Sequence, residues 1–208
     1  MESARPRPLE GLRVIEAGQL LAGPFAGTIL GYFGAEVIKV EPPEGGDPIR
    51  RWRIVKNNTS LWWYSLARNK KCITLDLRQA KGRELMRQLV NKSDVLIENF
   101  RPGTMEKWDL GPQDFKATNA GLIYSRISGY GQTGPYAPRP GFASVCEGFG
   151  GFRFVNGFPG EASVRPNLSI GDTLAGVHAA LGILLALIGR DRVTRGAGQV
   201  VDVAIFES

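Results

Sequence analysis

The sequence predicts an α/β fold with an open, mostly parallel sheet of Rossmann type. Short apolar segments alternate with helical segments along most of the chain, and turns that contain glycine or proline follow several of the apolar segments. At 208 residues the chain is long enough to bury the core of one domain. We therefore expect one sheet with helices packed on it.

The first unit is predicted to be a strand, a turn, a helix and a second strand. Residues 12–17 form the expected first strand and residues 19–24 the turn. Pro24 is well placed to begin a helix over 25–33, and 36–40 is the expected second strand. A strand, helix and strand at this spacing favour a βαβ unit with parallel pairing.

The same alternation continues through the middle of the chain. Further strands are expected at 72–77, 94–98 and 122–127, and further helices at 80–91 and 113–119. Residues 128–165 are rich in glycine, proline and phenylalanine, and we expect them to form a long ordered loop that lines a site.

The C-terminal part contains an apolar segment without charge at 174–189, followed by a predicted strand at 199–206. The apolar segment is short for a membrane span, so we expect a buried helix and no membrane association. A stripe of small residues would let another helix approach closely, within the subunit or across a dimer. The stripe consists of Ala175, Ala179, Gly182 and Ala186. The chain thus divides into βα units (1–127), an active-site loop region (128–170), and the buried helix with a terminal strand (171–208).

Asp172 lies at the start of this apolar helix. As an N-cap it would stabilise the helix by about 1 kcal/mol. The same position suits chemistry, because free N–H groups and the helix dipole favour an ionised carboxylate, which needs no base to act as a nucleophile. His178 is the only histidine. Catalysis that needs a histidine base or several histidine ligands is therefore nearly excluded within this chain.

Composition narrows the classes of partner and cofactor. The net charge of +6 favours anionic partners. Cys72 and Cys146 lie far apart without a Cys-x-x-Cys pattern, so neither a zinc site nor a disulfide framework is expected. The turn at 19–24 lacks the Gly-x-Gly-x-x-Gly fingerprint, so NAD is not expected. The segment 1–8 has no apolar stretch of the kind found in signal peptides, and we expect a cytoplasmic protein.

Two basic clusters, at 50–56 and 68–71, lie near tryptophan residues. Such clusters are commonly solvated surfaces. Arginine and lysine interleaved with aromatic rings can also stack a base and bind phosphates. A nucleotide-bearing cofactor or single-stranded nucleic acid would satisfy this pattern.

Six short motifs occur in one order along the chain. They are Leu-Ala-Gly-Pro (21–24), Gly-Ala-Glu-Val-Ile-Lys-Val-Glu (34–41), Arg-Asn-Lys-Lys (68–71), Asp-Val-Leu-Ile-Glu-Asn-Phe-Arg-Pro-Gly (94–103), Ser-Gly-Tyr-Gly-Gln-Thr-Gly-Pro (128–135) and Gly-Asp-Thr-Leu-Ala-Gly (171–176). Together they resemble the class III CoA-transferases, from about Leu9 to the last residue.

The resemblance implies that Asp172 is the catalytic nucleophile. In the family an aspartate forms a mixed anhydride and then an aspartyl-CoA thioester, so that coenzyme A passes from one carboxylic acid to another without ATP or metal. Acyl-CoA and a carboxylic acid acceptor are the implied partners, and nucleic acid is not expected. Family members are longer and form interlocked dimers. Residues 1–208 would be the N-terminal portion of the large domain, completed by a C-terminal remainder or a second copy.

Seven positions match CoA-binding positions of the family by the same resemblance. They are Leu20, Ala22, Leu75, Arg78, Asn99, Phe100 and Lys107. Lys107 stands where some members have an arginine, which keeps the charge but loses the bidentate fork. Pro42 and Ser128 stand where formyl-CoA transferase has an arginine and a lysine, so the sequence predicts that those two contacts are missing.

Three alternatives remain open. The racemase branch carries a histidine where Phe142 stands, so transfer is preferred over racemisation. A CoA-binding protein without catalysis is a second alternative, and nucleic-acid binding a third. The acyl groups are not specified, although Arg139, Arg153 and Arg165 in the loop region are candidates to recognise a second carboxylate.

Overall fold

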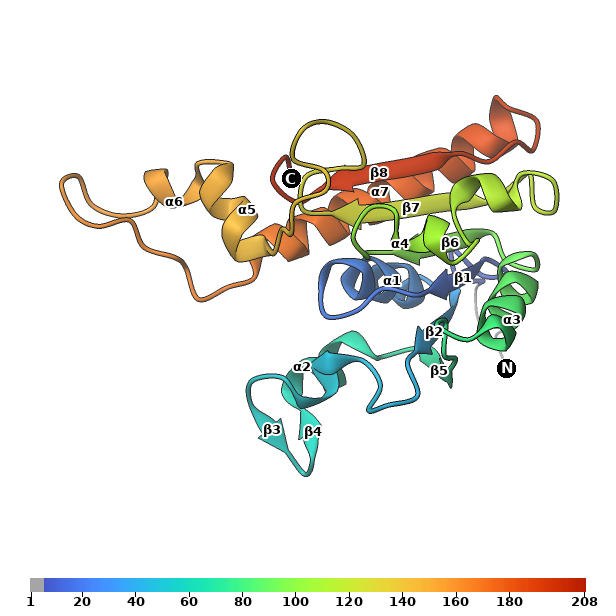
Figure 1. Cartoon of the computed structure of the whole chain (residues 1–208), viewed down its shortest axis with the longest axis horizontal. Helices are drawn as coiled ribbons and strands as arrows, with labels where there is room; N and C mark the ends of the chain where they lie inside the picture. The colour runs from blue at the N-terminus through green and yellow to red at the C-terminus, as the bar shows by residue number, and fades with distance from the viewer. Residues whose placement is uncertain (1–5) are drawn as a thin grey trace.

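A computed structural model describes residues 6–208 and contains a six-stranded sheet with the order β5-β2-β1-β6-β7-β8. Every neighbouring pair in this sheet is parallel. Figure 1 shows the sheet with α7 along one side and α3 on the other, a lobe that carries a small hairpin, and an arm formed by α5 and α6. The predicted open parallel α/β sheet is confirmed.

The bounds of the elements are as follows. The sheet strands are β1 (Arg13–Glu16), β2 (Glu36–Glu41), β5 (Lys70–Thr74), β6 (Val95–Glu98), β7 (Ile123–Ser128) and β8 (Val200–Ala204), and the hairpin is β3 (Val55–Lys56) with β4 (Thr59–Ser60). The α-helices are α1 (Ala22–Tyr32), α2 (Leu61–Leu66), α3 (Ala80–Val90), α4 (Thr104–Lys107), α5 (Ala143–Phe149), α6 (Phe152–Val155) and α7 (Ile170–Arg192). The short 3₁₀ helices are η1 (Pro48–Arg51) and η2 (Pro112–Phe115).

The six predicted strands correspond to the six strands of the main sheet, but one lies in a different place. The strand predicted at 72–77 begins at Lys70 and ends at Thr74. Asn69 precedes it with a φ of 61°, a left-handed turn that the sequence pattern did not reveal. The helix predicted at 113–119 is only the 3₁₀ turn η2, because Asp114 accepts the N–H of Gly111 and closes a short local structure.

The region predicted as a loop, 128–165, contains the helices α5 and α6, so this prediction was wrong in detail. Both helices are short, and their large side chains are mostly uncovered, as at Phe154, which is 88% exposed. Helix α6 has no buried residue and α5 buries only Ala143, Cys146 and Glu147, so neither shows a clear amphipathic period. The hairpin β3–β4 and helix α2 were not predicted either.

The sheet separates two apolar cores because successive strand residues point to opposite faces. Val14 and Ile97 pack on the side of α1 and α7, while Ile15 and Leu96 pack on the side of α3. These four side chains are fully buried. The strands are apolar on both sides because helices cover both faces of the sheet.

Helix α7 closely approaches another helix, α1 of the same chain, but at Gly176, which lies outside the predicted stripe; Gly182 of the stripe faces Val201 of β8. A Cβ added to Gly176 would lie 2.9 Å from the carbonyl oxygen of Ala22. Only one side of α7 is buried, however, since Leu181 and Leu185 are exposed. With 23 residues, α7 is longer than the apolar segment at 174–189, and by length and composition alone it could cross a membrane; 44% of its most apolar stretch is buried in the protein. The core helix of a soluble protein can have the same length and composition.

The division of the chain at 127 and 170 stays a prediction, although β8 joins the same sheet as the first strands by pairing with β7. Most of the N-terminal segment on which the expectation of no export signal rests lies outside the described residues, which begin at residue 6.

Candidate active site

The larger of two neighbouring cavities lies at the carboxyl ends of β1, β6 and β7 and has a volume of about 480 Å³. Its lining includes the turn after β1 (residues 19–21), the turn after β6 (residues 99–102), and the first turns of α5 and α7. The strand order runs in opposite directions from β1 and from β6. Open α/β sheets bind ligands at this kind of reversal point.

Asp172 lies in the first turn of α7 and lines this cavity. The N-cap of the helix is Ser169, and its side chain makes no capping bond. The interpretation of Asp172 as an N-cap is therefore wrong, while its expected place in the first turn is confirmed. Its carboxylate faces the cavity and does not cap the helix.

The environment of Asp172 raises its pKa to about 6, chiefly through burial and then through the negative charge of Glu147, while Arg165 acts in the opposite direction. We expected the helix terminus to favour the ionised carboxylate. Burial and the second carboxylate outweigh that effect. At pH 7, above this pKa, the ionised carboxylate that a nucleophile needs predominates.

Glu147 and Arg165 surround the start of α7. One oxygen of Glu147, Oε1, accepts the N–H of Gly171 at 3.1 Å, and the other, Oε2, accepts Nε–H of Arg165 at 3.2 Å. Glu147 is buried in α5, and Arg165 comes from the segment that leads into α7. Sequence reasoning missed Glu147 because nothing in its neighbourhood distinguishes it from a surface acid.

Two other polar groups of the site differ from Asp172. Cys146 donates from Sγ to the carbonyl of Gly129, and burial together with the charge of Asp172 raises its pKa to about 11. The thiol is thus neutral at physiological pH and does not compete as a nucleophile. Ser128 lines the cavity with a buried Oγ that has no hydrogen-bond partner, which leaves one polar atom available to a ligand.

The turn after β1 is held by side chains from distant segments. Leu20 has a φ of 61°, a left-handed conformation that is strained for leucine, and its N–H donates to Oδ1 of Asp47 at 3.0 Å. Asn99 accepts the N–H of Gln19 at 2.7 Å and donates to the carbonyl of the same residue at 2.8 Å. Asn99 therefore has two roles: it lines the cavity, and it holds the turn that forms part of the cavity wall.

A buried ion-pair network lies directly behind this turn. Lys39 contacts Glu16 at 3.0 Å and Asp47 at 2.8 Å, and Lys70 contacts Glu16 at 2.7 Å. Burial lowers the pKa of Lys70, whereas for Lys39 the two carboxylates overcome burial and raise the pKa. This arrangement could not be predicted from sequence, because its members come from separate strands and loops.

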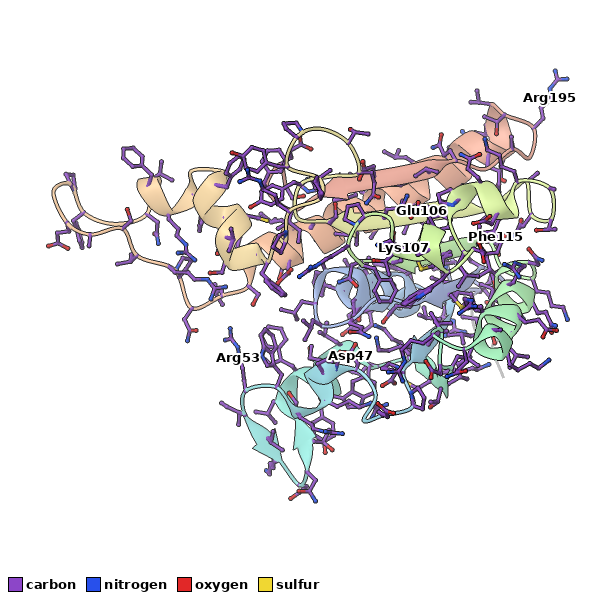
Figure 2. All side chains as sticks on the ribbon, viewed as in Figure 1. Asp47, Arg53, Glu106, Lys107, Phe115 and Arg195 are labelled. Atoms are coloured by element: carbon purple, nitrogen blue, oxygen red, sulfur yellow. The ribbon has the colours of Figure 1, made fainter. Side chains whose placement is uncertain are left out.

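The network corrects the interpretation of the two basic clusters. Lys70 is buried and paired with Glu16, and Lys71 pairs with Glu36. Arg50 pairs with Glu41 and stacks over Trp63 at 3.6 Å from the ring centroid. Much of the positive charge expected to face phosphates is thus neutralised within the protein. Arg53 is an exception among the described residues, since it lines the larger cavity (Figure 2).

A second cavity of about 210 Å³ opens beside the first and shares Gln19 and Phe100 with it. Leu75 and Arg78 line it, together with Trp108, whose ring packs edge-on against Phe100 at 5.3 Å. Arg78 also contacts Asp76 at 2.9 Å on the surface.

The structure brings together five of the seven positions assigned to CoA. Leu20 and Asn99 line the larger cavity, Leu75 and Arg78 the smaller one, and Phe100 lines both. Two positions do not join them. Ala22 is buried where α1 meets α7, and Lys107 lies exposed on α4, outside the lining of either cavity (Figure 2).

Comparison with known proteins agrees with this geometry. The family model described as CoA-transferase family III matches residues 9–208. The chain belongs to this family. As a family III CoA-transferase it is 54% identical, over its whole length, to succinyl-CoA–D-citramalate CoA-transferase of Chloroflexus aurantiacus, of which it covers 52%. It is 38% identical to the succinate–glutarate CoA-transferase of Agrobacterium fabrum, with 98% of the chain and 52% of the relative covered.

Solved structures of the family are also similar. A CaiB/BaiF family protein from Brucella suis superposes with a TM-score of 0.92 at 40% identity, over 98% of this chain and 54% of that protein. This family III CoA-transferase chain thus spans about half the length of the relatives it matches. The relatives that it matches over about half their length are CoA-transferases by name.

Proposed function

We propose that the protein transfers coenzyme A between carboxylic acids, with Asp172 as the nucleophile. One observation carries the proposal. Asp172 is the only acidic side chain among the described residues that line the larger cavity. A partly buried carboxylate in a cavity lined by arginines and backbone turns is suited to attack a thioester carbonyl without a separate base.

The proposed reaction proceeds by four exchanges at carbonyl carbon. A carboxylate oxygen of Asp172 attacks the acyl-CoA carbonyl, the C–S bond breaks, and the CoA thiolate leaves a mixed anhydride. The thiolate then attacks the aspartyl carbonyl and releases the first acid as its carboxylate. The acceptor carboxylate attacks the aspartyl thioester and forms a new anhydride, from which the thiolate takes the acceptor acyl group. Asp172 is regenerated as a carboxylate, so charge and atoms balance.

The two cavities suggest where the substrate lies. The nucleotide end of CoA fits the smaller cavity beside Leu75, Arg78 and Phe100. The thiol arm then passes Gln19 and Phe100, which both cavities share, and places the thioester near Asp172. Ser128 offers its unpaired Oγ to a substrate oxygen in the same cavity.

The proposal extends to assembly. Relatives named as alpha and beta subunits of succinyl-CoA–L-malate CoA-transferase occur in Chloroflexus aurantiacus. We propose that this chain works in the cytoplasm within a dimer or with the remaining half of the fold, which would cover the open side of the cavity. The names of the relatives also make succinyl-CoA the first donor to test.

Mass spectrometry of the assembled enzyme tests the nucleophile. Incubation with succinyl-CoA followed by hydroxylamine is expected to mark the peptide that contains Asp172, and Asp172→Asn is expected to lose both the mark and turnover. Cys146→Ala removes the nearest thiol and should leave the mark in place. Marking of a different side chain, or turnover retained in Asp172→Asn, would refute the assignment.

Racemisation is a second reaction of the family, and among the described residues the cavity lacks the histidine that would be the partner base of Asp172. Phe142 lines the cavity where racemases carry a histidine, while the single histidine, His178, is exposed on α7 and is not part of the lining. With a chiral 2-methylacyl-CoA in heavy water we expect no deuterium at the α-carbon. Rapid incorporation, measured by mass spectrometry, would instead establish racemase activity.

A further inference from the structure

Arginine is concentrated around the larger cavity. Four arginines line it, whereas Asp172 is its only acidic lining residue among those described. The four are Arg53, Arg101, Arg139 and Arg165. An excess of guanidinium groups around a small cavity favours a ligand with more than one negative group.

The four arginines differ in their surroundings. Arg101 directly follows Phe100, where the two cavities meet, so it lies on the expected path of the CoA chain. Arg53 stacks on Trp52 at 4.8 Å and Arg139 stacks on Tyr136 at 4.4 Å, measured to the ring centroids. Stacking holds both guanidinium planes against neighbouring rings.

Arg165 is the only one of the four that is tied to the nucleophile's surroundings. Its Nε–H donates to Oε2 of Glu147. The other oxygen of Glu147 accepts the N–H of Gly171, the residue before Asp172. The positive charge of Arg165 also acts on Asp172, because it opposes the rise in the pKa of the Asp172 carboxyl group. The two terminal amino groups of Arg165 form no hydrogen bond within residues 6–208.

We propose that Arg165, oriented by Glu147, binds the distal carboxylate of a dicarboxylic acyl group while its thioester carbon is at Asp172. This inference rests on the proposed CoA transfer. A guanidinium whose Nε is already fixed presents its remaining N–H groups in a plane, which matches the two oxygens of a carboxylate. A short chain separates the two carboxyl carbons of a succinyl group. Its distal carboxylate could therefore bind Arg165 while its thioester carbon lies at Asp172, because both residues line the same cavity.

Glu147 has a defined part in this arrangement. It restricts the rotation of the Arg165 side chain, so less conformational freedom is lost when the substrate binds. It is a positioning residue, because it contacts the arginine and the helix start and does not line the cavity.

The test compares succinyl-CoA with butyryl-CoA, which has a methyl group in place of the distal carboxylate. The ratio of kcat/KM for the two donors is measured in the assembled enzyme. We expect the parent protein to favour succinyl-CoA and Arg165→Gln to reduce the ratio by about tenfold or more. Arg165→Lys, which keeps charge but loses the planar fork, should fall between them.

The ratio separates recognition from a general effect on the nucleophile. Loss of the Arg165 charge raises the pKa of Asp172 and slows both donors alike, which leaves the ratio unchanged. Arg87→Gln is the matched control, because Arg87 also makes one side-chain hydrogen bond, to the carbonyl of Asp109, and lies on α3, outside the lining of the cavity. Residual turnover of butyryl-CoA by each variant shows that it is folded.

Four outcomes overturn the inference. An unchanged ratio in Arg165→Gln excludes carboxylate recognition by this residue. A reduced ratio in Arg139→Gln but not in Arg165→Gln assigns the role to the other arginine. If neither donor labels Asp172, the proposed function itself fails. Labelling by both donors with equal efficiency leaves the proposed function standing and removes only the dicarboxylate specificity.

Discussion

Asp172 is a carboxyl group whose surroundings oppose its ionisation, and this has a measurable effect on rate. Because its pKa is raised to about 6, the charged nucleophile is depleted as pH falls below that value. We expect kcat/KM to fall on the acid side with an apparent pKa near 6. Glu147→Gln removes the neighbouring negative charge but can still accept the N–H of Gly171, so the acid limb should move to lower pH.

Measured pH profiles of kcat/KM check this prediction. Glu106→Gln is a suitable control, since Glu106 pairs with Arg126, outside the lining of the cavity (Figure 2). It should leave the acid limb where it is. An acid limb that stays in place in Glu147→Gln would show that burial alone raises the pKa of Asp172.

The same carboxyl group lowers the stability of the fold at neutral pH. Its pKa is about 6 in the folded protein against 3.8 for an unperturbed aspartate, so the stability it contributes is complete below about pH 4 and is lost as pH rises through 6. Asp172→Asn should therefore increase the free energy of unfolding at pH 8 by roughly 1–3 kcal/mol and change it little at pH 4. Urea unfolding at the two pH values measures the difference, and an equal effect of the substitution at both would contradict this pH dependence.

At the scale of elements, the turn after β1 depends on Asn99. Asn99→Ala removes two hydrogen bonds to Gln19, and we expect a loss of about 1–3 kcal/mol in stability together with about tenfold weaker CoA binding. Urea unfolding and isothermal titration of CoA measure the two effects.

Asn119→Ala provides the matched control for that variant. Asn119 also makes two side-chain hydrogen bonds to backbone, with the carbonyls of Val90 and Ser93, but it does not line either CoA cavity. It should lose stability without losing CoA affinity. Equal loss of affinity in both variants would mean that the turn is not specifically held by Asn99.

The elements show what sequence can and cannot provide. The strands before Gln19 and Asn99 were predicted within a residue or two, because apolar runs between turn residues mark them. Asp172 was placed at a helix start by the uncharged run that follows it. Glu147, Asp47 and Lys39 were missed, because their roles arise only when distant segments pack together. The two short helices of the arm were missed because they bury few apolar side chains.

For the whole molecule, the exposed face of α7 is the feature with the clearest consequence. Leu181, Leu185 and Ile188 are each more than half exposed on one side of this helix. Soluble proteins rarely leave a continuous apolar surface of this kind uncovered. We expect the protein to associate at micromolar concentration and Leu185→Glu to weaken that association, as measured by sedimentation velocity.

Lys81→Glu on α3 is the control for association, since Lys81 is well exposed on the opposite side of the sheet. It should sediment like the parent protein. A parent protein that is monomeric at every concentration would contradict the prediction.

The contact between Gly176 and Ala22 has a consequence for how the reaction would proceed. The backbone of α1, which begins at the turn that lines the larger cavity, packs closely against the helix that carries Asp172. A side chain at position 176 would have to displace the carbonyl oxygen of Ala22. In the transfer that we propose, this close packing favours a fixed Asp172, and the flexible arm of coenzyme A would carry the sulfur from one carbonyl to the next.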